Sequence, residues 1–414
     1  MFNRIIKSLI VLTGAALLVC ACGPAPAPTT EVPPTDTPAP LPSATLETTM
    51  NAHWVFETEA AVWGSASLNG DTVFIGSDDG NLYALEAQSG SLLWKFASQG
   101  IVRSTPAVAG DLVYFSSDDG FLYAVRADDG TKAWSTDIGN FYDRAAREGF
   151  NMSSGDPTGY DYVQSSPVVA DGTVYVGSTD KNLYALDANT GAVKWTFATS
   201  NKIRATPAVD QGTVYFGSWD ELMYAVDVAT GKARWAVGVG GEVQSKAVVA
   251  NGMVYTASRR ASVVALDAQT GGLNWEYSYG SNLWVESSPN LVNGVIYIGS
   301  SGSKIVLGLD ALTGKPTSIY TSKDFHWSTP LIIGDRLYIG GTSPAPDASG
   351  GLYSLSMTNG TFFNATTDLQ VFSTATTREY ANVWIGIAGS PVTENGLIYF
   401  GALDGKVYAV NAIP

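Results

Sequence analysis

A short repeat runs through the chain from Trp54 onward and constrains the fold more than any other feature. Each copy has an aromatic residue shortly before a Gly-Ser or related pair. These aromatics are Phe74, Tyr114, Tyr175, Tyr215, Tyr255, Tyr297, Tyr338 and Tyr399. The steps between them are nearly equal except for Tyr114 to Tyr175 and Tyr338 to Tyr399, so two of the eight copies are extended. A period of about 40 residues with several short strands per copy is typical of a β-propeller.

Each copy divides into four short strands, named A to D here. Strand A is a Ser-x-Pro-x-Val run, strand B a Val-Tyr-x-Gly run and strand C a Leu-Tyr-Ala-Leu run, while strand D carries a tryptophan. Turns such as Asn69-Gly70 and Asn251-Gly252 favour two-residue hairpins between strands A and B. We therefore expect one four-stranded antiparallel blade per copy.

The last copy ends shortly after Val410 and has no strand D. The missing piece lies at the other end, because Trp54-Val55-Phe56 lies one period before the matching Trp94-Lys95-Phe96. We expect this N-terminal strand to complete the last blade. The predicted fold is an all-β, eight-bladed propeller over residues 51–414, and its closure removes exposed sheet edges.

The repeat resembles the pyrroloquinoline quinone (PQQ) repeat family in its Ala-x-Asp-x-x-Thr-Gly-x-x-x-Trp segments at 185–195, 225–235 and 265–275. This resemblance implies an eight-bladed ring in which the repeated tryptophan packs between blades. Aromatic residues at strand spacing also favour sheet packing on physical grounds. The Asp residues of these segments are expected to accept turn N–H groups, because one carboxylate per turn is too few oxygens for Ca²⁺.

Residues 1–21 have the pattern of a secretory signal peptide, with Arg4 and Lys7 before an apolar stretch too short for an ordinary membrane span. The end of this segment resembles the bacterial lipoprotein cleavage box, which implies a diacylglycerol on Cys22; ordinary cleavage that leaves a spare thiol is the alternative. Residues 22–50 are rich in Pro and Thr and are expected to be an extended tether. We expect an exported protein that is lipid-anchored to the cell membrane or the outer membrane, with its head outside the cytoplasm.

Composition excludes several kinds of chemistry. The formal net charge of −15 argues against nucleic-acid binding and against a membrane surface held by charge. The two cysteines, Cys20 and Cys22, lie before the repeats and the chain has only two histidines, so neither a disulfide framework nor a Cys/His zinc site is expected. Phosphate-binding loops and esterase motifs are missing from the sequence. We expect no catalytic residue, no metal and no cofactor.

The extra residues of the long copies all fall on one face of the predicted ring. D-to-A and B-to-C loops share that face, and they include the long connections 130–167, 360–391 and 340–351. Aromatic and Arg residues in these loops suit a surface that binds a protein partner, although they would also serve to pin the loops to the ring. The candidates are Phe141, Tyr142, Arg144, Arg147, Phe150, Tyr160, Tyr162, Arg378, Tyr380 and Trp384.

The residue before each strand A forms a second candidate set, the mouth residues. Strand A is innermost in a propeller, so these side chains should surround the opening of the central channel on the elaborated face. In ring order they are Trp63, Arg103, Gln164, Arg204, Gln244, Glu286, Trp327 and Ala388. The first seven suit a planar or anionic ligand, and the alternative is a water-filled funnel of mutually bonded polar groups.

Three functions are compatible with these patterns. The leader, the ring size and the lack of catalytic residues resemble BamB-type lipoproteins, which implies a monomeric, non-catalytic scaffold for a protein partner in the cell envelope. The long tether departs from that type. A PQQ-dependent alcohol or sugar dehydrogenase is the second reading; it would need PQQ and Ca²⁺, with Asp220 and Glu286 as the inner acids to test. A sensor head that binds a glycan or another ligand is the third.

Overall fold

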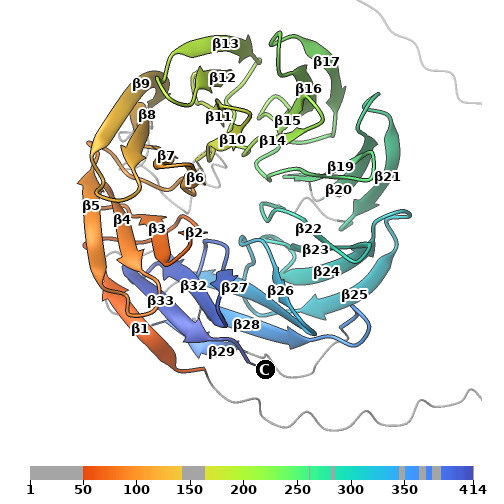
Figure 1. Cartoon of the computed structure of the whole chain (residues 1–414). Coiled ribbons are helices and arrows are strands. Elements are labelled where there is room, and N and C mark those ends of the chain that lie inside the picture. The colour runs from red at the N-terminus through yellow and green to blue at the C-terminus, as the bar shows by residue number, and fades with distance from the viewer. Residues whose placement is uncertain are drawn as a thin grey trace, which may run out of the picture. The chain divides into compact units, whose positions relative to one another are not determined.

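The computed structural model describes residues 50–141, 164–260, 262–280, 285–344, 350–362, 370–374 and 384–413. These residues form eight antiparallel sheets arranged as blades around a central axis (Figure 1). Within the described ranges the regular elements are all strands, and none contains a helix long and apolar enough to cross a membrane. The predicted eight-bladed, all-β propeller is confirmed.

Strand order within the blades follows the chain, with strand A innermost and strand D outermost in the view of Figure 1. Blades 1 to 3 consist of β2 (Ser67–Asn69), β3 (Thr72–Gly76), β4 (Asn81–Glu86), β5 (Leu92–Ala97); β6 (Ala107–Ala109), β7 (Leu112–Ser116), β8 (Asp119–Arg126), β9 (Lys132–Phe141); and β10 (Val168–Ala170), β11 (Thr173–Gly177), β12 (Asn182–Asp187), β13 (Val193–Ala198). Blades 4 and 5 consist of β14 (Ala208–Asp210), β15 (Thr213–Gly217), β16 (Leu222–Asp227), β17 (Ala233–Gly238); and β18 (Val248–Ala250), β19 (Met253–Ser258), β20 (Ser262–Asp267), β21 (Leu273–Ser278).

The remaining blades contain the departures from the repeat. Blades 6 and 7 consist of β22 (Asn290–Val292), β23 (Val295–Gly299), β24 (Ile305–Asp310), β25 (Pro316–Thr321); and β26 (Leu331–Ile333), β27 (Arg336–Pro344), β28 (Gly351–Ser356), β29 (Gln370–Ser373). Blade 8 consists of β31 (Val392–Glu394), β32 (Leu397–Ala402), β33 (Lys406–Asn411) and β1 (Ala52–Glu57). An additional strand, β30 (Trp384–Gly386), pairs with the extended end of β27.

Blade 8 closes the ring as expected, because β1 is its outermost strand and pairs antiparallel with β33. Val55 lies opposite Tyr408, and Phe56 lies opposite Val407. The first strand of the propeller and the last are therefore joined by backbone hydrogen bonds, so β33 is not left as an unpaired edge and blade 8 has four strands like the regular blades.

The strand-D tryptophans join consecutive blades, which confirms the packing role inferred for them. Each indole N–H donates to a carbonyl in the C–D turn of the next blade, at 2.7 to 3.0 Å. The indole also lies against the turn glycine of that blade; at Gly130, where φ is +70°, an added Cβ would come within 2.6 Å of Trp94 Cε3. Six such residues serve six interfaces: Trp54, Trp94, Trp134, Trp195, Trp235 and Trp275.

The two interfaces without a tryptophan are filled differently. Between blades 6 and 7 the tryptophan position is Ser318, and Phe362 of blade 7 packs against Tyr297, with ring centroids 6.3 Å apart. The Phe362 N–H donates to Ser318 Oγ at 3.0 Å. Between blades 7 and 8 the chain end takes this place, because the N–H of Ile413 donates to the Tyr338 hydroxyl at 2.9 Å.

A carboxylate in five of the B–C loops accepts a hydrogen bond from the tyrosine hydroxyl four residues later, at 2.6 to 2.7 Å. Burial and then this hydrogen bond raise the pKa of each tyrosine well above its ordinary value. The pairs are Asp79–Tyr83, Asp119–Tyr123, Asp180–Tyr184, Asp220–Tyr224 and Asp404–Tyr408. The aspartates of the Thr-Gly turns accept turn N–H groups as expected, for example Asp187 from Thr190 at 3.0 Å.

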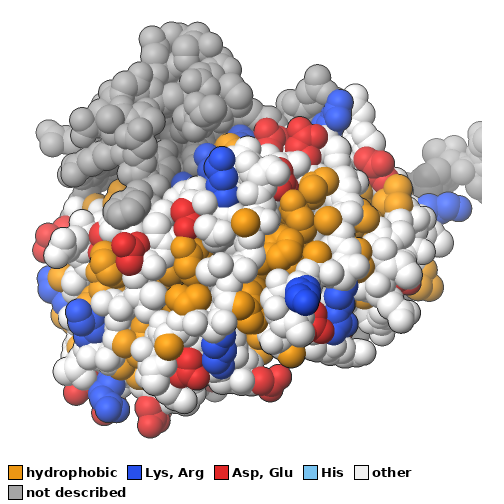
Figure 2. Space-filling view, turned by 90° about the horizontal axis from the view of Figure 1, so that it is seen from above, with side chains coloured by type: hydrophobic (Ala, Val, Ile, Leu, Met, Phe, Trp, Pro, Cys, Tyr) orange, Lys and Arg blue, Asp and Glu red, His pale blue; other side chains and the backbone are white. Residues whose placement is uncertain are grey.

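Contacts between loops confirm that D–A and B–C loops share one face. The N–H of Glu59, in a D–A loop, donates to Asp79 of a B–C loop at 2.9 Å, and Gln99 and Asp119 repeat this contact one blade later. On the outer wall of the propeller, basic and acidic side chains alternate with apolar ones (Figure 2). The exposed apolar side chains there include Val55, Leu93 and Leu273 on strands D.

Candidate ligand site in the central channel

A cavity of about 1050 Å³ occupies the centre of the ring. The first residues of the strands A and the segments just before them form its wall, so every blade contributes. Six of the seven predicted mouth residues line this cavity: Trp63, Arg103, Gln164, Gln244, Glu286 and Trp327. Ala388 lines it as well, whereas the side chain of Arg204 is 1% exposed and lies outside the lining.

Arg103 is held by the preceding blade. Its guanidinium makes a bidentate contact with Asp78, with Nε and Nη2 at 2.7 and 2.5 Å from the two carboxylate oxygens. The guanidinium carbon also lies 4.9 Å from the centre of the Trp63 ring. Both charged side chains are largely buried, at 5% and 15% exposure, so this pair fixes blade 1 against blade 2 at the channel wall.

Gln164 fixes blade 3 against blade 2 in the same way. Its side-chain oxygen accepts the backbone N–H groups of Arg103 and Ser104, both at 3.0 Å, and its nitrogen donates to Asp118. Both the nitrogen and the oxygen of the Gln164 side chain are thus engaged in hydrogen bonds within the protein. For Arg103 and Gln164 the structure supports the funnel of mutually bonded polar groups.

The partners of the mouth residues follow a rule that sequence reasoning missed. In three blades a side-chain partner is the second residue after the recurring small residue at or near the end of strand B of the preceding blade, as in Gly76-Ser77-Asp78. Asp118 and Arg259 occupy the same position, and Arg259 lies 3.5 Å from the Glu286 carboxylate. The signal was present in the repeat, in the residue that follows the Gly-Ser pair.

Gln244 departs from this rule, because Trp219 occupies the position of Asp118. The Gln244 side chain is 3% exposed, and neither its nitrogen nor its oxygen has a hydrogen-bond partner among the residues that the structure describes. Trp219 instead has Lys202 Nζ 3.6 Å and the Arg259 guanidinium carbon 4.9 Å from its ring centre. The Gln244 amide therefore differs from that of Gln164, whose nitrogen and oxygen are both bonded within the described residues.

An aromatic cluster covers the wall formed by blades 1 and 7. The rings of Trp63 and Trp327 are stacked, with centroids 5.7 Å apart and an interplanar angle of 16°. Trp384 meets Trp327 edge-on at 4.7 Å and Phe325 at 5.3 Å. Trp384 belongs to β30, so a predicted partner-binding residue of a long loop lies at the channel instead of standing apart from it.

Trp384 is the one predicted loop residue whose side chain the structure describes. Phe141 ends β9, and nothing further is described of its side chain. The remaining candidates of the long connections lie outside the described residues, as does Cys22: Tyr142, Arg144, Arg147, Phe150, Tyr160, Tyr162, Arg378 and Tyr380.

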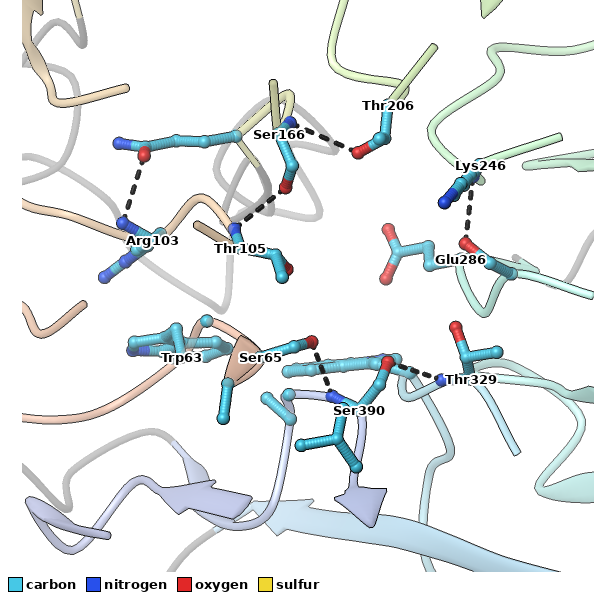
Figure 3. A pocket seen from close by; sticks show the side chains of 18 of the residues that line it. Trp63, Ser65, Arg103, Thr105, Ser166, Thr206, Lys246, Glu286, Thr329 and Ser390 are labelled. Carbon is cyan, nitrogen blue, oxygen red and sulfur yellow. Dashed lines mark hydrogen bonds between the residues drawn. The ribbon is translucent and has the colours of Figure 1, made fainter. Parts of the chain in front are cut away.

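A second ring of side chains lies two residues after the mouth residues and is called the hydroxyl ring. Its hydroxyls accept backbone N–H groups from the preceding blade, as in Thr105 to Ser166 at 2.9 Å and Thr329 to Ser390 at 2.9 Å (Figure 3). Seven positions are Ser or Thr and the eighth is Lys246: Ser65, Thr105, Ser166, Thr206, Lys246, Ser288, Thr329 and Ser390. The backbone N–H of Lys246 donates to Ser288 at 2.9 Å, and its side chain points into the cavity.

Comparisons with known proteins agree with this architecture. A crystal structure of BamB from Moraxella catarrhalis matches 70% of this chain and 85% of its own at 22% identity, with a TM-score of 0.58. A computationally designed protein, Ika8, matches 88% of this chain and 98% of its own at 13% identity, with a TM-score of 0.64. At these identities the likeness concerns the fold.

An enzyme shares the fold as well. A europium-containing methanol dehydrogenase matches 87% of this chain and 93% of its own at 13% identity, with a TM-score of 0.64. No curated protein matches the sequence. The family model described as outer membrane protein assembly factor BamB matches residues 44–141, 152–244 and 224–413, which together span the whole propeller. The chain therefore belongs to the BamB family of PQQ-repeat propellers.

Proposed function

We propose that this protein is a non-catalytic, membrane-tethered propeller scaffold that binds a protein partner in the cell envelope through its loop-elaborated face. The family match over the whole propeller carries this proposal. The lipoprotein-like leader with Cys22 and the Pro/Thr-rich segment support a lipid-anchored head outside the cytoplasm. The anchor and the partner are both part of the proposal.

The two acids selected from the sequence, Asp220 and Glu286, do not fit the Ca²⁺ that a quinone dehydrogenase would need, and only Glu286 lines the cavity. The Asp220 carboxylate already accepts hydrogen bonds from the Tyr224 hydroxyl at 2.7 Å and the Ser200 N–H at 2.9 Å. Glu286 faces Arg259. No group of three His, Cys, Asp or Glu in the part of the chain that is described is arranged to hold a metal ion. Because Ca²⁺ takes six to eight oxygen ligands, these residues support a scaffold over an enzyme.

The test is partner capture from cells. The full-length protein, and a variant with Arg144→Ala, Arg147→Ala, Arg378→Ala and Tyr380→Ala in the long connections, would be cross-linked in living cells and purified. A matched control carries Asn189→Arg and Gln269→Arg, two exposed positions in C–D turns of the opposite face. We expect the loop variant to lose a partner that the wild type and the control both retain, with unchanged melting temperatures.

Two results would contradict the proposal. Equal partner recovery by the loop variant and the control would show that the elaborated face is not the binding surface. Reduction of an electron-acceptor dye with an alcohol or aldose, after loading with PQQ and Ca²⁺, would show that the protein is an enzyme.

A further inference from the structure

Two residues of blade 5 break both rings of the channel wall. Gln244 is the mouth residue whose amide is unmatched, and Lys246, two positions later, is the one cation in the hydroxyl ring. Both line the cavity. In every other blade the hydroxyl-ring position carries a Ser or Thr that can accept a backbone N–H from its neighbour, which an ammonium cannot do.

The Lys246 ammonium points into the cavity and has no acid within ion-pair distance among the described residues (Figure 3). The neighbouring carboxylate of Glu286 is directed to Arg259, at 3.5 Å. Although the Lys246 side chain is reachable from the channel, the surrounding protein removes enough water to lower the pKa of its ammonium. The Lys246 side chain is exposed to the channel and the described residues supply no counter-charge, so an anion in the channel can pair with it.

The Gln244 amide needs a different partner. Its nitrogen is a donor without an acceptor and its oxygen is an acceptor without a donor, within the described part of the chain. A buried polar group without a hydrogen-bond partner is destabilising. A ligand hydroxyl, which both donates and accepts, matches this pair, whereas a simple anion satisfies the nitrogen alone.

The wall at blades 1 and 7 is largely aromatic. Trp63, Trp327 and Trp384 line the cavity there, and the indole N–H of Trp384 has no acceptor among the residues described. The hydroxyl ring adds donors, because Ser166, Thr206 and Ser288 accept a backbone N–H and their own O–H groups have no acceptor among the described residues. The ligand must therefore be rich in acceptors, carry hydroxyls and present a flat C–H face to the indoles.

We infer that the central channel binds an acidic saccharide, with its carboxylate at Lys246, a ring hydroxyl at Gln244 and a sugar face against the tryptophan wall. A cavity of about 1050 Å³ is slightly larger than the usual range for small-ligand sites, so a short oligosaccharide fits. Trp384 belongs both to this wall and to the predicted partner surface, but saccharide binding is measured without a protein partner.

Binding of trigalacturonate to the full-length protein, measured by titration calorimetry, tests the inference. Its methyl ester is the matched neutral probe, and inorganic phosphate is the simple anion. We expect trigalacturonate to bind at least ten-fold more tightly than the ester. Lys246→Thr, which restores the residue type of the other blades, should remove this ten-fold preference without changing affinity for the ester. Gln244→Leu should weaken both saccharides.

Two control variants distinguish the loss of the positive charge at position 246 from a general effect of losing a lysine. Lys246→Arg should keep the preference for the acid, and Lys232→Met, at an exposed C–D turn, should bind as the wild type does. No binding of trigalacturonate at millimolar concentration would overturn the inference. Equal affinity of Lys246→Thr and the wild type for the acid would overturn the role of Lys246, and displacement of the saccharide by equimolar phosphate would overturn the saccharide as ligand.

Discussion

Replacing Gly130 by alanine should weaken the contact between blades 1 and 2 much more than the same replacement at Gly110. Both glycines lie in hairpin turns of blade 2 with positive φ, +70° and +58°. An added Cβ at Gly110 meets no atom within 4 Å, whereas at Gly130 it would lie 2.6 and 2.8 Å from two carbons of Trp94. The pair thus separates backbone strain from the tryptophan contact.

The magnitudes follow from these two causes. A left-handed backbone costs a residue with a Cβ about 1–2 kcal/mol, which is the whole effect expected for Gly110→Ala. Overpacking adds about 1–3 kcal/mol, so Gly130→Ala should cost about 2–5 kcal/mol. In a Trp94→Ala background the ring is gone, and Gly130→Ala should cost no more than Gly110→Ala.

Urea unfolding followed by far-UV circular dichroism measures these differences, provided that all variants unfold in one transition with the same slope. The four variants around Trp94 and Gly130 form a double-mutant cycle with a coupling energy of about 1–3 kcal/mol. Equal costs at Gly110 and Gly130, or a Gly130→Ala cost that persists without the tryptophan, would refute the packing argument.

Three further predictions address other parts of the ring. Above about pH 10 the unfolded chain loses tyrosine protons that the folded Asp–Tyr pairs retain, so the melting temperature should fall as pH rises, and a flat profile from pH 9 to 12 would contradict the raised pKa values. Arg103→Ala leaves Asp78 buried without its partner and should cost about 3–5 kcal/mol in urea unfolding, more than Arg103→Lys. Phe362→Ala should cost about 3–5 kcal/mol, since Phe362 fills an interface that lacks a tryptophan; a cost below about 1 kcal/mol would show that Tyr297 repacks.

The blades could be predicted because their determinants are local. Hairpin turns, alternating side chains and the tryptophan recur within each copy of the repeat, so one copy explains the others. Ring closure was also visible, because Trp54-Val55-Phe56 is recognisably a displaced strand D. What the period could not show is the filling of the two irregular interfaces by Phe362 and Ile413, since neither residue has a counterpart in the repeat.

The sequence predicted where the mouth residues lie but not which of their polar atoms have hydrogen-bond partners. Placing the mouth residues required only that strand A be innermost. Their bonding depends on the preceding blade, 25 residues back for the partner of Arg103 and 46 for that of Gln164, so it differs between side chains of the same type. Gln164 and Gln244 are identical in the sequence, yet one is fully bonded and the other is not, because Asp118 and Trp219 differ. The placement of Trp384 depended on β30, an added strand outside the period.

Closure within blade 8 also makes the propeller suitable for circular permutation, because its first and last strands are neighbours. Ala52 lies opposite Val410, so the two ends of the ring are neighbours and a short linker can join them. New termini could then be opened in any tight D–A loop, for example after Gly240, without removing a strand pair. The position of the termini therefore does not decide which strands pair in the propeller. It decides only at which blade the N-terminal segment joins the propeller.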